Sequence, residues 1–329
     1  MSTHTTQPAL SRPARDGAGP LPPTATPPLP SGSRADAGRR RRSRSFQPAW
    51  LFMAPSLIIL GVFVLFPILQ TLYYSFFDWT IGASSQKFLG LGNYIRLFQD
   101  PQFWNALGVT LIFTAVAVVL QITLGFGSAL LLLRENLITR IVRSVYFFPT
   151  IVSFVTIGLV WKFLLDPSIG LVGGLTQLLG LQPVAWLQST SLALPSVIFV
   201  AVWRSVGFAM ILFVAALKAV PAERYEAGRL DGANNRQLTF FITIPSVRPT
   251  LLFATMILTI QSLQVFDLVY VMTDGGPVFH TDSLVNLIYR DGFVNYQTGY
   301  ASAISWVLFA LIMLLSLLQL RLFRYNDVD

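Results

Sequence analysis

The sequence predicts an all-α, polytopic membrane protein with about six transmembrane helices. Of its 329 residues, 53% are hydrophobic and only 12% are charged, whereas soluble domains average about 25% charged. A larger soluble core does not explain this deficit, because its surface would still need polar groups. Several apolar runs also reach the roughly 20 residues that cross a bilayer. Basic residues border most of these runs, as they do at the cytoplasmic ends of transmembrane helices.

The composition also excludes several kinds of chemistry. There is no cysteine, and the only histidines are His4 and His280. A disulfide framework, a thiol nucleophile and a thiolate metal site are therefore impossible, and histidine-based metal or acid–base chemistry is disfavoured. We expect no cofactor and no metal ion in this chain.

Residues 1–45 are rich in Pro, Ala, Ser, Gly and Arg and have almost no large apolar side chains. They cannot bury enough surface to offset the entropy of ordering, so we predict a disordered basic tail. The run Arg39–Arg42 could be a nucleic-acid patch, but its place beside the first apolar run favours an orientation signal near anionic headgroups. We therefore expect no nucleic-acid partner.

A membrane domain is predicted for residues 46–325. Its transmembrane helices are expected near residues 50–77, 106–133, 145–165, 192–217, 249–272 and 300–322. With the tail inside the cell, most of the 23 Lys and Arg residues fall on the same side of the membrane. Because cytoplasmic loops carry the excess of Lys and Arg, both termini are predicted to be cytoplasmic in a multi-pass protein of the cell membrane.

The most informative loop covers residues 218–248, between the fourth and fifth predicted helices. Pro221 suits a first helical position, and Gly232 is placed to end the helix in a left-handed cap. A second short helix is expected over residues 235–243, with Pro245 and Pro249 before the fifth transmembrane helix. Such a helix pair cannot bury its apolar side alone. The headgroup layer and another protein are equally open as its partner.

Within this loop stand Glu226-Ala227-Gly228, three residues, Gly232, nine residues, and Ile242-Thr243-Ile244-Pro245. This pattern resembles the signature loop of the membrane subunits of bacterial ABC importers, which reads Glu-Ala-Ala, three residues, Gly, nine residues and Ile-x-Leu-Pro. Gly228 replaces the second Ala and Ile244 replaces Leu.

The resemblance extends from about residue 48 and is closest to carbohydrate-type permeases, similar to the maltose and glycerol-phosphate systems. Its further motifs are Gly92-Asn93-Tyr94, Trp203 with Gly207-Phe208, Asp231-Gly232-Ala233, Gly275-Gly276-Pro277 with Thr281, and Tyr300-Ala301-Ser302-Ala303.

The resemblance implies a transport subunit for a sugar or sugar-like solute, and not an enzyme. It further implies a second homologous permease, ATPase subunits that carry ATP and Mg, and an extracytoplasmic solute-binding protein. The expected ATPase contacts are Glu226, Ala227, Gly228, Asp231, Gly232, Ala233, Ile242 and Pro245. Independently, no lysine follows a glycine as a phosphate-binding loop requires, so ATP hydrolysis is expected on another chain.

Polar residues inside the predicted helices are candidates for the translocation path. Arg204, near the middle of the fourth helix, either lines the path or pairs with carbonyl or acidic groups. Gln261, Gln264 and Asp267 recur at spacings of three in the fifth helix, where they either line a sugar path or join helices. Trp203 and Phe208 either stack on sugar rings or pack.

Three other classes remain open. A secondary transporter would usually need intramembrane carboxylates, which are almost absent here. A membrane-anchored assembly or sensor protein would not require the loop spacing. An ABC permease for a non-sugar solute remains possible, because the weaker motifs alone indicate a sugar.

Overall fold

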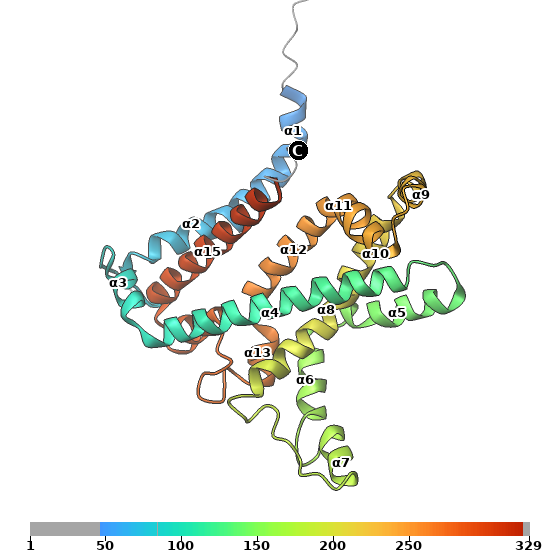
Figure 1. Cartoon of the computed structure of the whole chain (residues 1–329). Helices are drawn as coiled ribbons and strands as arrows, with labels where there is room; N and C mark the ends of the chain where they lie inside the picture. The colour runs from blue at the N-terminus through green and yellow to red at the C-terminus, as the bar shows by residue number, and fades with distance from the viewer. Residues whose placement is uncertain (1–46, 84, 325–329) are drawn as a thin grey trace, which may run out of the picture. The chain divides into compact units, whose positions relative to one another are not determined.

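The computed structural model describes residues 47–83 and 85–324, so the predicted tail lies outside the described residues. The chain divides into two units, residues 1–55 and 56–329. Residues 47–55 belong to the first turns of α1 (Gln47–Leu60). In the second unit, the described elements are almost all helical (Figure 1).

Four described helices are long and apolar enough to cross a membrane. They are Phe52–Tyr74, formed by α1, the π-helical η1 (Gly61–Leu65) and α2 (Phe66–Tyr74), then α4 (Pro101–Leu131), α8 (Ala193–Lys218) and α15 (Thr298–Arg324). Two bent helix pairs raise the number to six if each pair is one span. The all-α class with about six transmembrane helices is therefore confirmed.

The third predicted helix is two helices. α5 (Leu137–Ile151) and α6 (Phe154–Leu164) meet at 101°. Pro149, in the last turn of α5, has no N–H to donate to the Val145 carbonyl, which weakens this turn. Val152 is extended, with ψ 143°. Apolar composition therefore continues through residues 145–165 while the helix does not.

The fifth predicted helix is also interrupted. α12 (Arg248–Leu263) ends before residues 264–266, and α13 (Asp267–Met272) follows. At its other end, the helical segment Asn235–Ser246 meets α12 at 69°. Val247 separates them, and Pro249 occupies the first turn of α12, where its missing N–H costs nothing.

Small residues allow the central helices to approach closely. A Cβ on Gly125 of α4 would lie 2.5 Å from the Ala209 Cβ of α8. A Cβ on Gly207 of α8 would lie 2.7 Å from the Tyr146 carbonyl carbon of α5. Because lipid is as apolar as the side chains, such close contact contributes much of the stability of membrane helices. The contacts among α4, α8 and α5 therefore fix the positions of the loops that these helices carry.

The remaining elements lie at the chain's connections. They are β1 (Phe77–Asp78) paired antiparallel with β2 (Lys87–Phe88), α3 (Gly92–Gln99), α7 (Leu171–Leu178), α9 (Ala222–Leu230), α10 (Asn235–Gln237), η2 (Leu238–Thr243), α11 (Ile244–Ser246), α14 (Leu284–Tyr289) and η3 (Arg290–Val294). Phe77 pairs with Phe88 and Asp78 with Lys87. Within this unit, α2 packs alongside α15 (Figure 1).

Candidate functional site

The loop that carries the signature spacing folds as a helix with a defined end. α9 begins after Pro221 and stops at Leu230. Gly232 has φ +82°, and the Ala233 N–H donates to the Gly228 carbonyl at 2.9 Å while the Gly232 N–H donates to the Arg229 carbonyl at 3.0 Å. These two bonds form a Schellman motif, which satisfies carbonyls left open by the helix end.

The second part of the loop begins with a capping box. The Asn234 side chain accepts from the Gln237 N–H at 3.0 Å, and the Gln237 side chain accepts from the Asn234 N–H at 2.8 Å. The helix then widens into the π-helical η2, in which the Ile244 N–H donates to the Thr239 carbonyl. The expected helix over residues 235–243 therefore continues as far as Ser246.

Gly228 has a packing role that sequence reasoning did not identify. A Cβ at this position would lie 2.7 Å from Ile242 Cδ1 and 2.8 Å from Leu238 Cδ2. Gly228 is buried, and it lets α9 lie directly against η2. The departure from Ala, which costs about 1 kcal/mol of helix propensity, thus accompanies a close helix contact.

The outer surface of this helix pair is exposed and partly apolar. Leu230 is 89% exposed, and Phe240 and Phe241 are also exposed. Glu226 is exposed on α9. A hollow of about 460 Å³ lies beside the contact between the two helices and is lined by Arg224, Ala227, Gly228, Asp231, Phe241, Ile242, Pro245 and Ser246. Five of the eight predicted contact residues therefore line one hollow. Glu226, Gly232 and Ala233 do not line it.

Arg204 contacts the corner between α5 and α6. Its guanidinium donates to the carbonyls of Thr150 at 3.1 Å and Val152 at 3.3 Å. It also lies over the Phe154 ring, 3.5 Å from the centroid, and the Thr150 hydroxyl donates to the Arg204 carbonyl at 2.9 Å. A cation at a helix C-terminus satisfies its open carbonyls and complements its dipole. Of the two roles that the sequence analysis considered for Arg204, this geometry supports pairing with carbonyl groups.

The three polar residues of the fifth predicted helix come together although the helix is broken. Gln264 caps α12 and Asp267 begins α13, so the continuous helical face assumed from their spacing does not exist. Gln261, Gln264 and Asp267 nevertheless line a cavity of about 60 Å³ with Ser205, Ser262 and Gln121. Because polar groups inside a membrane domain need partners, this cavity gathers donors and acceptors.

Sequence reasoning missed Gln121. Its side chain is 3% exposed, and Oε1 has no hydrogen-bond partner among the described residues. It shares the buried face of α4 with Thr110 and Thr114. The spacings of four and seven between these residues, the only Thr and Gln on that buried face, put them on one side of a helix. A stripe of polar side chains along one side of the second apolar run could therefore have been predicted from the sequence.

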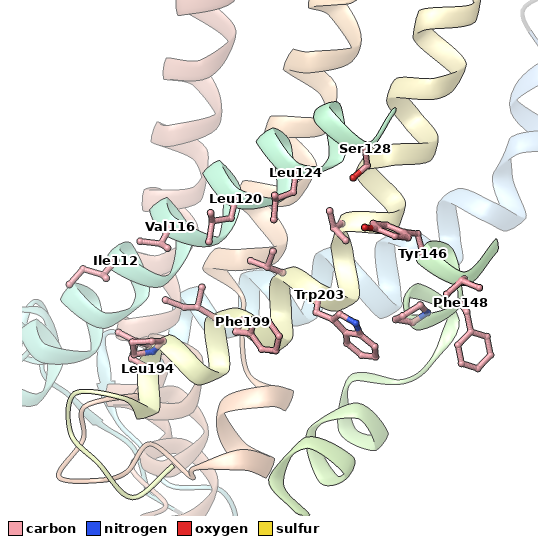
Figure 2. Close-up of a pocket in the computed structure, with 16 residues that line it drawn as sticks. Ile112, Val116, Leu120, Leu124, Ser128, Tyr146, Phe148, Leu194, Phe199 and Trp203 are labelled. Atoms are coloured by element: carbon pink, nitrogen blue, oxygen red, sulfur yellow. The ribbon is translucent and has the colours of Figure 1, made fainter. Parts of the chain in front are cut away.

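The two aromatic candidates lie elsewhere. Trp203 borders an apolar groove of about 810 Å³ between α4, α5 and α8 (Figure 2). Figure 2 shows Ile112, Val116, Leu120 and Leu124 in a row along α4 beside this groove. Phe208 packs against the core around Phe213 and Met210. Neither aromatic ring lines the polar cavity.

Among the described residues, no group of three or more His, Asp or Glu side chains could hold a metal ion.

The broken apolar helices, the small cavity with its polar side chains and the capped loop describe a polytopic helical membrane protein. The chain belongs to the family of binding-protein-dependent transport system inner membrane components, which matches residues 121–327. It is therefore a membrane-embedded ABC permease, a transport subunit and not an enzyme.

Relatives extend this membership over most of the chain. The probable ABC transporter permease protein YurN of Bacillus subtilis is 35% identical and aligns with 84% of this chain and 95% of its own length. The lactose transport system permease protein LacF of Rhizobium radiobacter is 36% identical, covering 82% and 92%. A bacterial ABC transporter that imports the acidic polysaccharide alginate contains a chain of the same fold, with a TM-score of 0.75 and 22% identity, covering 84% and 95%.

Proposed function

We propose that this chain forms part of the transmembrane path of an importer for a sugar or sugar-like solute. The relatives support a sugar, since they include lactose and multiple-sugar permeases. A second permease, separate ATPase subunits that bind ATP and Mg, and an extracytoplasmic binding protein complete the importer. One solved relative in fold is complexed with a pentasaccharide-bound periplasmic protein.

The observation that carries the proposal is the surface of α9 and η2. Its cap and buried Gly228 fix the pair as one unit, while Leu230 and Phe241 remain exposed beside charged side chains. Large apolar side chains that are exposed among charged ones are expected to be covered by a partner protein. The pair is joined through Val247 to α12, so displacement of the docked pair would reach the polar cavity.

The orientation follows from the same surface. ATPase subunits work in the cytoplasm, so docking there places residues 218–248 inside the cell. If each bent helix pair is one span, four spans precede this loop and two follow it, so both termini are also expected in the cytoplasm, in agreement with the distribution of Lys and Arg. Labelling of single cysteines introduced at Ser189 and Gln237 by an impermeant maleimide in intact cells should modify only the residue at position 189.

The docking role is tested by Glu226→Lys, with Glu223→Lys as the control because both exposed residues lie on α9 and only Glu226 belongs to the signature. We expect Glu226→Lys to insert normally but to lose solute uptake and co-purifying ATPase. Glu223→Lys should retain most of both. Equal uptake by Glu226→Lys and the unaltered protein would contradict the docking role.

The solute class is tested with the reconstituted importer and labelled solutes. Uptake should require ATP inside the vesicle, survive collapse of ion gradients and favour mono- or oligosaccharides over amino acids. The cavity contributes to this path through Gln121, Gln261 and Gln264, whose amides match sugar hydroxyls. Gln264→Leu should raise the KM for the sugar without reducing the amount of assembled importer.

A further inference from the structure

A pocket between α12 and α15 combines positive charge with an apolar floor. It encloses about 430 Å³ and is lined by Arg248, Pro249, Leu252, Leu317, Leu320, Arg321 and Phe323. No acidic residue is among the described residues that line it. The volume lies within the range of roughly 300–1,000 Å³ that is typical of ligand pockets.

The two arginines lie at helix ends. Arg248 is the first residue of α12, and Arg321 lies in the last turn of α15. Each is placed beside apolar residues of its own helix at helical spacing, Leu252 four residues after Arg248 and Leu317 four residues before Arg321. The pocket therefore changes from apolar along the helices to cationic at their ends.

The apolar lining is open toward the surroundings. Leu317 is 51% exposed and Leu320 is 42% exposed, in a helix that is long and apolar enough to cross the membrane. Arg321 is exposed as well. Arg248 lies 6.0 Å from the centroid of the Phe323 ring and makes further contacts. A ligand for this pocket must present an anion to the arginines and hydrocarbon to the leucines.

We propose that this pocket binds an anionic phospholipid, with its phosphate between Arg248 and Arg321 and the start of an acyl chain on Leu317 and Leu320. Arginine presents a planar set of donors that matches phosphate oxygens. Basic pockets between transmembrane helices recognise lipid headgroups in this way. A free phosphate would use the arginines but not the leucines, and a zwitterionic lipid would bring its own cation to the arginines.

The test is native mass spectrometry of the importer purified in mild detergent, titrated with phosphatidylglycerol or with phosphatidylcholine. We expect a saturable phosphatidylglycerol site with at least ten-fold preference over phosphatidylcholine. At about 1 kcal/mol per arginine near the membrane surface, Arg321→Gln should weaken binding roughly five-fold, and Arg248→Gln with Arg321→Gln about thirty-fold. Arg140→Gln is the matched control, because Arg140 is exposed and does not line the pocket.

A second arm tests the apolar half and the identity of the ligand. Leu317→Asn should weaken phosphatidylglycerol binding. Inorganic phosphate should not displace the bound lipid. Displacement of the lipid by inorganic phosphate at similar concentrations would overturn the lipid assignment. Equal binding of both lipids, or equal losses of phosphatidylglycerol affinity in Arg140→Gln and Arg321→Gln, would mean that the lipid belongs to the non-specific layer around the protein. Either result would also overturn the proposal.

Discussion

Replacement of Gly207 by alanine tests the close packing of α8 against α5. The new Cβ would lie 2.7 Å from the Tyr146 carbonyl carbon and 2.9 Å from the Phe147 Cα, and closer still to the Tyr146 oxygen. Carbon atoms in contact normally lie about 3.5–4.0 Å apart, so the two backbones must separate by about 1 Å. Neither obstacle is the end of a flexible side chain.

The expected cost is about 1–3 kcal/mol, the usual penalty for overpacking a close contact. Alanine also gains roughly 0.5–1 kcal/mol over glycine within a helix. Gly127→Ala on α4 is the matched control, because nothing lies within 4 Å of a Cβ there. Since both variants share the propensity gain, the difference between them isolates the steric cost of about 1–3 kcal/mol.

The free energy of unfolding can be measured in mixed micelles by increasing the fraction of denaturing detergent. Gly207→Ala should unfold at a lower fraction than the unaltered chain, and Gly127→Ala at an equal or higher one. Equal free energies for the two alanine variants would refute the close packing of α5 on α8.

Three further predictions concern other contacts. Arg204→Leu should lower the unfolding free energy by about 1–3 kcal/mol for each of the Thr150 and Val152 carbonyls left without a donor, with a smaller loss for Arg204→Lys, in the same micelle assay. Gly228→Ala should keep ATPase co-purification, because the obstructing Leu238 and Ile242 atoms are flexible side-chain ends, whereas Gly228→Leu should abolish it. Burial raises the pKa of Asp282 above its ordinary value of 3.8, despite its hydrogen bond from Asn286 at 2.8 Å and its ion pair with Arg290 at 2.9 Å. The folded state therefore binds this proton more tightly than the unfolded state does, so the contribution of Asp282 to stability falls as pH rises from about 3.8 through the raised pKa. Asp282→Asn should flatten this part of the pH profile of thermal unfolding. An unchanged profile would contradict the raised pKa of Asp282.

Features that depend on neighbouring residues were predictable from the sequence. Gly232 adopts its left-handed conformation because the helix end requires it. Pro249 stands in the first turn of α12, where a missing N–H is harmless, whereas Pro221 lies one residue before α9 and not at its first position. Four long apolar runs correspond to long helices. The coupling roles of the loop residues remain predictions.

Features that depend on distant contacts were not predictable. Apolar composition reports that a segment lies in the membrane but not that its helix is continuous, so the corner after Ile151 and the break after Leu263 were missed. The corner is stabilised by Arg204, more than 50 residues away in the chain. Gly228 looked like a weakened helix position because its neighbours Leu238 and Ile242 belong to another segment. Gln121 could have been predicted, because its helical spacing from Thr114 can be read from the sequence.

The bonds at the α5–α6 corner run in both directions. Arg204 donates to Thr150 and Val152, while Thr150 donates back to the Arg204 carbonyl. Rotation of α8 about its own axis would break the donated and the accepted bonds together, so the corner and the middle of α8 must turn as one rigid body. A conformational change of this permease is therefore expected to move the corner together with the middle of α8.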